Sequence, residues 1–546
     1  MTSRTAITRI ANRVRTAVRP LVTVTPPPQH VRMDRDVEVP MRDGTILRVN
    51  VFQPESAGQY PVLMSAHPYG KDNLPKPRGR GRGFRPPFQA RLIPQSEPYT
   101  ISAWTSWEAP DPGFWVPRGY VLVNADLRGW GRSDGVGTLL SEQEADDYHD
   151  LIEWAGDQPW SNGRVGLSGV SYLALSQWGA AATRPSRLAA ICPWEGFTDA
   201  YRDLMRPGGV REDGFVVMWA RGLRRQRRSP VPIRAEQKRR PLLDDWWRER
   251  LQPLEEVEVP ALVCGSFSDH NLHSGGSVRG FERIGSRQKW LYTHRGPKWS
   301  TYYGRAASDF QARFFDHFLR DDDTGIDRQP PVRLEVREDA TTVVDVRGED
   351  DWPLSRTEWR RVPLAGRSDR IVFDTRSGSA RFPHRFDEDT EITGPMALRI
   401  HLRLDGADDM AVFAGVRKRR AGRVVGFEGS YGFTLALVTC GWLKVSHRAI
   451  DVERSLPWAP FHPHTRAVPL RPGDVASLDI GLLPSATLFR AGEELEVIVQ
   501  GRWFFPFNPL VGQFPARYER SPRARCTVLC GGEHDSSLLV PVVPGT

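Results

Sequence analysis

This chain of 546 residues contains few cysteines, and its sequence has no recognisable metal-binding or nucleotide-binding motif. The five cysteines are Cys192, Cys264, Cys440, Cys526 and Cys530. An odd, scattered set with only one isolated Cys-x3-Cys pair does not fit a disulfide framework or a zinc site. The sequence also has no phosphate loop of the G-x-x-x-x-G-K-[ST] kind, no His-Glu-x-x-His and no dinucleotide fingerprint. We therefore expect neither a metal nor another cofactor.

Long hydrophobic runs are absent as well. No stretch approaches the length of a membrane span, and the first residues lack the apolar run and small-residue cleavage site of a secretory signal. The composition, 39% hydrophobic and 26% charged residues, is that of a folded globular protein. The length favours two or three packed units. The expected location is the cytoplasm, with no membrane partner.

Acidic residues are missing from the first 33 positions, although arginine is frequent there. A second basic segment, Lys71–Arg85, contains repeated Arg-Gly pairs. These two segments account for much of the net charge of +9. We interpret residues 1–34 as a flexible tail and the second segment as a solvated loop, with contact to nucleic acid or a membrane as the alternative. Nucleic acid is not an expected partner.

Short apolar runs alternate with helical patterns from about residue 45 to about residue 320, which is typical of a mostly parallel sheet in an α/β fold. The helical spacing is clearest over Glu142–Ala155. The predicted strands are Pro61–Ala66, Tyr120–Ala125, Gly163–Ser168, Leu188–Pro193, Pro260–Gly265 and Lys289–Thr293.

Two regions depart from this alternation. Residues 198–256 are helical in pattern, rich in Arg and Trp, and without a good strand, so we predict a helical cap inserted into the core; outer helices are the alternative. From about residue 331, alternating apolar residues separated by turns predict an all-β sandwich. Its predicted strands include Val332–Val336, Met396–Leu404, Ala411–Arg417 and Leu495–Gln500. The α/β core would then comprise residues 35–197 and 257–330, and the β domain residues 331–546.

Ser171 is the candidate nucleophile. It follows the predicted strand at Gly163–Ser168, stands between small residues, and precedes an Ala-rich helical segment. This is the pattern of a nucleophile elbow, in which a strained turn exposes a serine at the edge of an α/β sheet. The G-x-S-x-G form would place Gly at 173, where Leu173 stands, and the next small residue is Ala174. A capped turn serine is the alternative interpretation.

A serine needs a base and a carboxylate, which in this fold follow it along the chain in the order acid, then histidine. Asp269 lies in the loop after the strand at Pro260–Gly265, and His294 directly follows the strand at Lys289–Thr293. We therefore predict catalytic Ser171, Asp269 and His294.

The sequence resembles the CocE/NonD family of hydrolases. This family includes the bacterial cocaine esterase and is related to X-prolyl dipeptidyl aminopeptidases and α-amino-acid ester hydrolases. The resemblance covers roughly residues 35–545. It rests on the segments His67–Lys71 (HPYGK), Asp126–Gly135 (DLRGWGRSDG), Gln158–Gly163 (QPWSNG) and Gly169–Leu173 (GVSYL).

The resemblance implies an α/β-hydrolase core, an inserted helical cap and a C-terminal jelly-roll domain. It also implies that the Tyr69 hydroxyl and the Tyr172 backbone N–H form the oxyanion hole. Better-known members carry their base in a Gly-Pro-Trp-x-His-like segment, but here Ser300 or Thr301 occupies that place, and neither hydroxyl can act as a base. We therefore retain His294 and hold His273, which is close to Asp269, in reserve.

The predicted function is hydrolysis of a small carboxylic ester through an acyl-enzyme. A close alternative is an X-prolyl aminopeptidase or α-amino-acid ester hydrolase, which would need acidic residues for a substrate ammonium; none stands out in residues 198–256. A different class is a binding protein that has lost its triad and uses the jelly roll for a carbohydrate or a partner. A homo-oligomer is compatible with the sequence.

Overall fold

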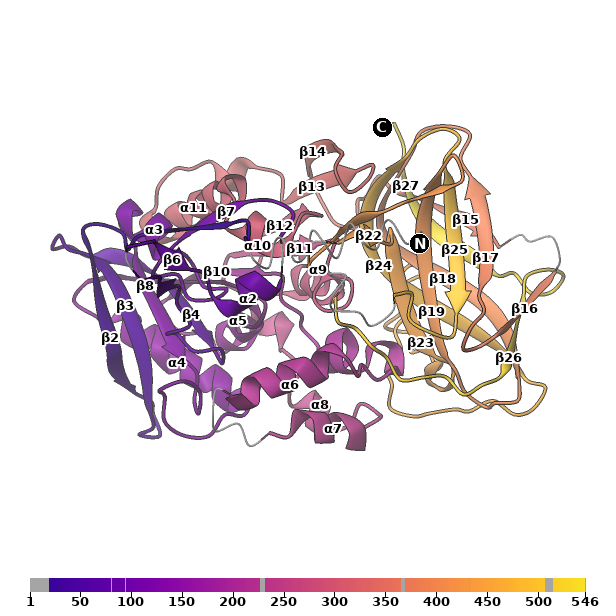
Figure 1. Cartoon of the computed structure of the whole chain (residues 1–546), viewed down its shortest axis with the longest axis horizontal. Helices are drawn as coiled ribbons and strands as arrows, with labels where there is room; N and C mark the ends of the chain where they lie inside the picture. The colour runs from indigo at the N-terminus through magenta and orange to yellow at the C-terminus, as the bar shows by residue number, and fades with distance from the viewer. Residues whose placement is uncertain are drawn as a thin grey trace.

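The computed structural model describes residues 19–79, 81–93, 95–225, 231–364, 369–431, 433–505 and 514–545. An N-terminal α/β part and a C-terminal β-sandwich lie side by side, and a group of helices lies beneath both (Figure 1). Among these described residues, none of the helices combines the length and hydropathy needed to cross a membrane.

The α/β part is built on a mixed sheet in which every neighbouring pair from β8 to β13 is parallel. All six strands predicted for the core lie in this sheet. The strand order is β13 (Val332–Arg337), β12 (Lys289–His294), β11 (Ala261–Ser266), β10 (Leu188–Trp194), β9 (Ser161–Val170), β4 (Tyr60–His67), β8 (Val121–Asp126), β3 (Ile46–Pro54) and β2 (Val31–Pro40).

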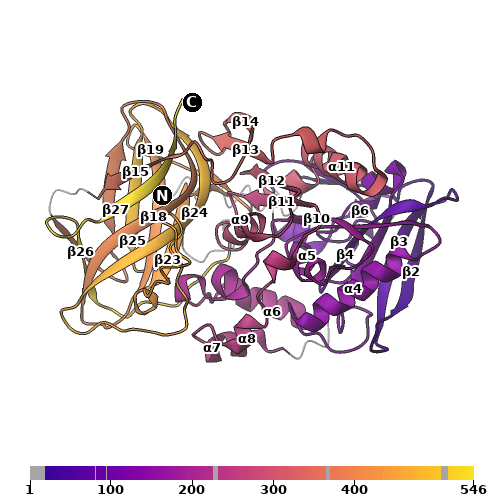
Figure 2. The same ribbon diagram turned by 180° about the vertical axis from the view of Figure 1, so that it is seen from behind.

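Helices cover both faces of this sheet (Figures 1 and 2). One face packs against α4 (Glu142–Gly156), α5 (Tyr172–Ala182) and α9 (Ser274–Arg283), and the other against α11 (Arg305–Arg320). The predicted helix over Glu142–Ala155 is α4. It begins where it does because the Ser141 side chain accepts from the Glu144 N–H, while Glu144 accepts from the Leu140 N–H. This arrangement resembles a capping box.

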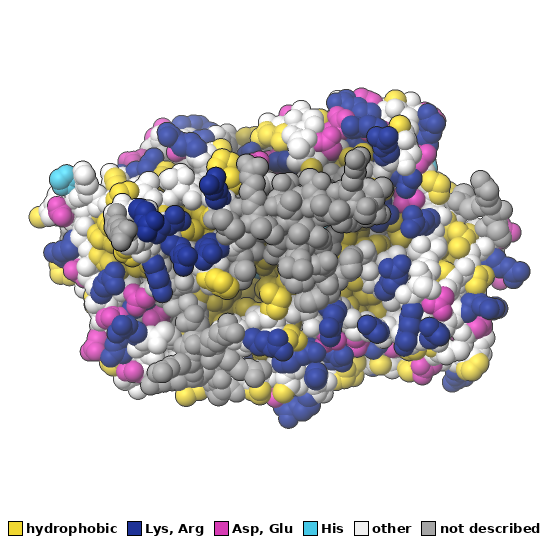
Figure 3. Space-filling model, viewed as in Figure 1, with side chains coloured by type: hydrophobic (Ala, Val, Ile, Leu, Met, Phe, Trp, Pro, Cys, Tyr) yellow, Lys and Arg dark blue, Asp and Glu magenta, His cyan; other side chains and the backbone are white. Residues whose placement is uncertain are grey.

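Each of the two basic segments departs from its prediction in part, although most described residues of Lys71–Arg85 are exposed as predicted. Residues 1–18 of the predicted tail lie outside the described residues, but Val22–Thr25 forms β1, which pairs in parallel with β7 (Tyr99–Ser102). The Lys71 side chain is fully buried and forms ion pairs with Asp36 and Asp72. These carboxylates offset the cost of removing the ammonium from water. On the face in Figure 3, Lys and Arg side chains gather at the left of the view, with few acidic side chains among them.

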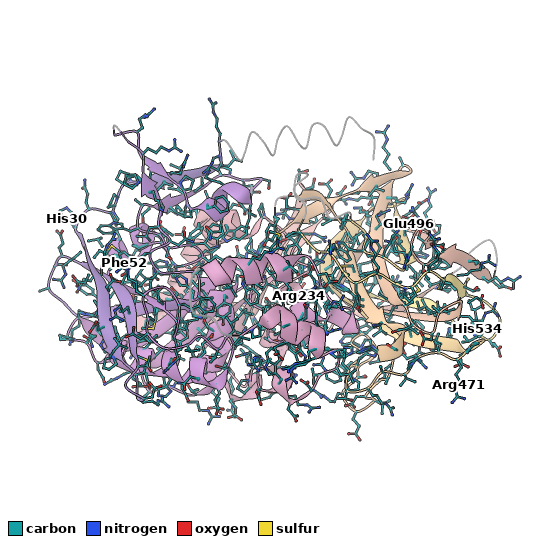
Figure 4. All side chains as sticks on the ribbon, turned by 60° about the horizontal axis from the view of Figure 1, so that its bottom comes forward. His30, Phe52, Arg234, Arg471, Glu496 and His534 are labelled. Atoms are coloured by element: carbon teal, nitrogen blue, oxygen red, sulfur yellow. The ribbon has the colours of Figure 1, made fainter. Side chains whose placement is uncertain are left out.

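The predicted cap, residues 198–256, leaves the sheet after β10 and returns at β11. Its described residues form helices and contain no strand. These helices lie in front of both halves of the molecule in Figure 4, where Arg234 is labelled near the centre. They are η2 (Ala200–Met205), η3 (Pro207–Gly209), α6 (Phe215–Arg225), α7 (Ile233–Arg239), α8 (Asp245–Arg248) and η4 (Leu254–Glu256).

The C-terminal part consists of two antiparallel sheets that share one apolar core. The first contains β15 (Glu358–Pro363), β27 (Ser537–Val543), β18 (Thr390–Asp405), β24 (Val475–Phe489), β26 (Arg525–Leu529) and β16 (Arg370–Asp374). The second contains β17 (Ala380–Arg385), β25 (Glu494–Gln500), β19 (Ala411–Arg420), β20 (Arg423–Val425) and β23 (Thr439–Lys444).

One predicted strand of the sandwich, Val332–Val336, belongs to the α/β sheet instead. It is part of β13, which pairs in parallel with β12 through Leu291 and Val332. At its other end β13 pairs with β24 of the sandwich, through Arg337 and Thr487. The strand therefore connects the two halves, and the sheets form a continuous hydrogen-bonded path.

The cap also contacts the sandwich closely at Gly208. This residue has φ +58°, and a Cβ there would lie 2.0 Å from the Trp442 carbonyl oxygen. We expect Gly208→Ala to lower the free energy of unfolding by roughly 2 kcal/mol, from backbone strain and displacement of Trp442. Thermal and urea unfolding would measure the loss. The matched control is Gly222→Ala in α6, where a Cβ meets nothing within 4 Å, so it should stabilise the protein slightly. Equal effects of the two variants would contradict the prediction.

Candidate active site

Ser171 stands on a strained turn between β9 and α5. Its backbone has φ 61° and ψ −118°, outside the regions a serine normally occupies. The Ser171 N–H donates to the Trp194 carbonyl at 3.1 Å, while its own carbonyl accepts from Ala174 and Leu175 in the first turn of α5. The serine is thus placed at the carboxyl end of β9, at the start of a helix, as the elbow pattern predicts.

The structure explains why Leu173 is compatible with this elbow. A Cβ on Gly169, whose φ is +151°, would lie 2.5 Å from the Leu173 Cβ. A Cβ on Gly196 would lie 2.7 Å from that of Ala174. The small residues that permit close strand and helix packing are therefore Gly169 and Gly196, so that a glycine at position 173 is not needed.

His273 is the histidine that faces Ser171. Its Nε2 lies 3.4 Å from the Ser171 Oγ, and its Nδ1 lies 2.5 Å from the Asp269 Oδ2. Both Asp269 and His273 are about 1% exposed. The structure therefore brings together a hydroxyl, an imidazole and a carboxylate in the order that nucleophilic catalysis requires.

A local turn creates the pairing of Asp269 with His273. The Asp269 carbonyl accepts from the backbone N–H groups of Leu272, His273 and Ser274, which coils the segment after β11 into the start of α9. Residues four apart on such a turn lie on the same side. The carboxylate and the imidazole thus come from one short segment.

The side chain of His294 does not face Ser171, although the prediction made it the catalytic base. It ends β12 opposite Ser266 of β11, as its place in the sequence suggested, but its Nε2 lies 3.2 Å from Glu195 and its ring is stacked on Trp194. No hydrogen bond to Ser171 occurs among the described residues; the ring is turned into the core by its packing. The geometry thus favours the reserve candidate, His273, over His294.

The two oxyanion candidates, Tyr69 and Tyr172, both lie next to the nucleophile. The Tyr69 hydroxyl interacts with the Ser171 side chain, and burial raises its pKa well above 10, so that the phenol keeps its proton. It accepts from the Trp219 Nε1–H of α6 at 3.3 Å. The Tyr172 N–H is the first amide of α5, which has no acceptor within the helix. The Tyr172 hydroxyl points elsewhere and donates to Glu144 at 2.9 Å.

A buried lysine, Lys298, adds a positive charge behind the histidine. Its Nζ lies 2.5 Å from the Asp269 Oδ2 and 2.8 Å from the His273 Nδ1. Burial opposes ionisation of Asp269, but the charge of Lys298 and the hydrogen bonds from His273 and Lys298 outweigh burial, and the pKa of Asp269 is lowered. Burial, and then the charge of Lys298, lower the pKa of His273 despite the nearby carboxylate. The imidazole is therefore held neutral.

Two groups of side chains have potential metal ligands within 4.8 Å of one another, namely Glu195 with Cys264 and His294, and Glu195 with Asp269 and His273. Lys298 lies 3.6 Å from Glu195 as well as 2.5 Å from Asp269. An ammonium already supplies the positive charge that these carboxylates need. We assign no metal to either group.

Lys298, Glu195 and Glu108 are site residues that the sequence reasoning did not single out. Glu195 and Glu108 both have positive φ, 49° and 69°, and Glu108 accepts from the Trp299 Nε1 at 3.3 Å. The sequence feature that could have pointed to Lys298 is its position inside the otherwise apolar segment Gly296–Trp299. Ser300 and Thr301 in the same segment bond to the Pro297 carbonyl.

Aromatic rings connect the three parts of the chain around the site. Ring contacts run from the core through the β domain to the cap. They join Trp107 to Trp299, Trp299 to Tyr431, Tyr431 to Phe514 and Phe514 to Phe215, at centroid distances of 4.9, 5.7, 5.0 and 5.0 Å.

The fold and the serine elbow define an α/β-hydrolase core with a C-terminal antiparallel β domain. Residues 43–297 match the family model described as X-Pro dipeptidyl-peptidase (S15 family), and residues 373–539 match that of the X-Pro dipeptidyl-peptidase C-terminal non-catalytic domain. The crystal structure of a CocE/NonD family hydrolase from Staphylococcus aureus is 36% identical, with a TM-score of 0.87, over 94% of this chain and 93% of that chain. The chain belongs to the CocE/NonD family of serine hydrolases, which confirms the resemblance seen in the sequence.

More distant relatives also match along most of the chain. The chain is 24% identical to the cocaine esterase of a Rhodococcus species, over 93% of this chain and 98% of that protein. An α-amino acid ester hydrolase structure has a TM-score of 0.65 at 16% identity, over 94% of this chain and 97% of that chain, and shows the shared fold.

Glu108 gives the site a titration that can be measured. Burial raises the pKa of Glu108 to about 8, whereas an unfolded glutamate has a pKa of about 4.3. Between these values only the folded protein holds the proton, so the contribution of Glu108 to stability is present at low pH and is lost as the pH rises through about 8. Glu108→Gln removes this dependence. Its free energy of unfolding should therefore increase relative to wild type by up to about 1.4 kcal/mol per pH unit between pH 5 and pH 8.

Urea unfolding of both proteins at several pH values measures this difference. The exposed Glu388→Gln is the matched control and should show no comparable trend. A difference between Glu108→Gln and wild type that stays constant with pH would contradict the prediction.

Proposed function

We propose that this serine hydrolase cleaves small carboxylic esters through an acyl-enzyme, with Ser171 as nucleophile, His273 as base and Asp269 as the orienting acid. The observation that carries the proposal is the pair of contacts made by one imidazole, 3.4 Å to the Ser171 Oγ and 2.5 Å to the Asp269 Oδ2. A hydrogen bond between nucleophile and base can be long before substrate binds and shorten in the complex.

In the first half of the reaction, the His273 Nε2 takes the Ser171 proton as the Oγ attacks the ester carbonyl. The oxyanion that forms accepts hydrogen bonds from the Tyr69 hydroxyl and the Tyr172 N–H, each worth roughly 3 kcal/mol of barrier. Trp219 donates to the Tyr69 oxygen, which leaves the phenolic proton for the oxyanion. The intermediate then collapses, and the alcohol leaves with the proton held by His273.

In the second half, His273 deprotonates a water that attacks the acyl-enzyme and releases the carboxylic acid. Asp269 stabilises the imidazolium in both halves through its bond to Nδ1.

The charges around the cap favour a substrate without an ammonium group. Every acidic side chain in residues 198–256 already has a partner, for example Asp203 with Arg279 and Asp213 with Arg211. Glu212 accepts from the backbone N–H groups of Gly214, Phe215, Val216 and Arg517. A substrate ammonium held by the cap would have to break one of these pairs. The aromatic rings around the site instead suit an apolar or aromatic acyl group.

Labelling with a fluorophosphonate probe tests the roles of the residues. Wild type should be labelled, and Ser171→Ala should not be labelled at all. His273→Ala should slow labelling by roughly 10³-fold, because the serine loses its base. His294→Ala should stay within about tenfold of wild type, since that ring contacts Glu195 rather than Ser171. An unlabelled wild type would support the binding-protein alternative, and a larger loss in His294→Ala than in His273→Ala would reverse the assignment of the base.

The substrate class is tested by comparing a p-nitrophenyl ester with X-Pro-p-nitroanilide. We expect the ester to be preferred by at least roughly 100-fold in kcat/KM, because the acidic side chains of residues 198–256 are already paired and would not hold the amino terminus. Acetylating the amine of the anilide should then change its kcat/KM little. A preference for the free-amine anilide would identify the chain as an aminopeptidase instead.

A further inference from the structure

Lys298 begins the short helix α10 (Lys298–Tyr302) with its side chain about 1% exposed. Its ammonium lies 2.5 Å from the Asp269 Oδ2, 2.8 Å from the His273 Nδ1 and 3.6 Å from the Glu195 Oε2. Removing such a charge from water is expensive unless anionic partners surround it. The surroundings of Lys298 therefore keep it charged, within hydrogen-bonding distance of the group that faces the nucleophile.

The hydrogen-bond chemistry limits what Lys298 can do there. An ammonium is only a donor, and the Nδ1 of a base-competent His273 must itself donate to Asp269 so that Nε2 is free to accept from Ser171. Lys298 therefore bonds to the Asp269 carboxylate. Towards His273 it acts as a positive charge, which opposes the charged imidazolium.

Other titratable groups also surround this cluster. Glu195 follows β10, His294 ends β12, and Glu108 lies in the loop before α3 (Pro112–Trp115). Tyr431 of the β domain also faces it. Glu195 is a carboxylate close to Lys298, so it offsets part of the lysine charge at His273. Removing Lys298 would leave His273 between the carboxylates of Asp269 and Glu195, which together favour the imidazolium.

We propose that Lys298 is a positioning residue that fixes Asp269 and keeps the imidazole of His273 neutral, which extends activity to lower pH. The inference rests on the proposed roles of Ser171, His273 and Asp269. It predicts that the lysine charge, rather than its bulk, determines the pH at which the enzyme loses activity.

The test is the pH dependence of kcat/KM for p-nitrophenyl acetate between about pH 4 and pH 9, in which the acid limb reports the protonation of the base in the free enzyme. Lys298→Met keeps the bulk and removes the charge. Its acid limb should move to higher pH by roughly one unit or more. Lys298→Arg keeps the charge and should restore the midpoint towards that of wild type.

Two further variants complete the design. Glu195→Gln removes a negative charge that offsets Lys298, so its acid limb should move to lower pH. Lys289→Met is the matched control, because Lys289 lies at the opposite end of β12 from His294, and its acid limb should coincide with that of wild type.

A Lys298→Met enzyme with the wild-type midpoint would overturn the inference. If circular dichroism shows that this variant does not fold, Glu195→Gln decides, with a downward shift supporting the inference and an unchanged midpoint overturning it. Failure of the proposed function is recognised separately. In that case wild type neither hydrolyses the ester nor reacts with the fluorophosphonate at any pH.

Discussion

The buried carboxylate of Asp269 is the group on which the arrangement of the site depends. It accepts from the His273 Nδ1 at 2.5 Å, the Lys298 Nζ at 2.5 Å and the Ser430 Oγ at 3.1 Å. A carboxylate out of water is stable only when donors replace its hydration. These donors come from the start of α9, from α10 and from the β domain, so separate parts of the chain must pack before the carboxylate is satisfied. The direction of the imidazole towards Ser171 is a consequence of this packing.

The three parts of the chain contribute different components of the site. The parallel strands of the core place Ser171 and Asp269 at one edge of the sheet, where the carboxyl ends of such strands gather. The cap provides Trp219, which bonds to the Tyr69 hydroxyl, and the β domain provides Ser430. The C-terminal domain, which the matching family model describes as non-catalytic, thus supplies one of the hydrogen bonds of Asp269.

Much of the fold could be predicted from residue patterns. The six apolar runs of the core are strands of the sheet, and Ser171 stands on the turn that follows β9. The wrong predictions concern segments whose residue pattern is compatible with more than one local structure or strand partner. Val332–Val336 alternates like a strand of the sandwich, yet it pairs with β12, because pairing partners depend on the packing of distant segments. Val22–Thr25 was assigned to a flexible tail although it pairs with β7.

The candidate base shows most clearly where sequence reasoning reaches its limit. His294 and His273 both follow Asp269 in the order the fold requires, and sequence position alone favoured His294. The sequence by itself determined which segments become strands, which serine ends one of them, and which carboxylate follows a later one, because these properties depend on local periodicity and turn residues. Only the tertiary structure decided which imidazole faces the serine and that a lysine lies behind it. Side-chain direction is set by packing and charge pairing between residues far apart in the chain.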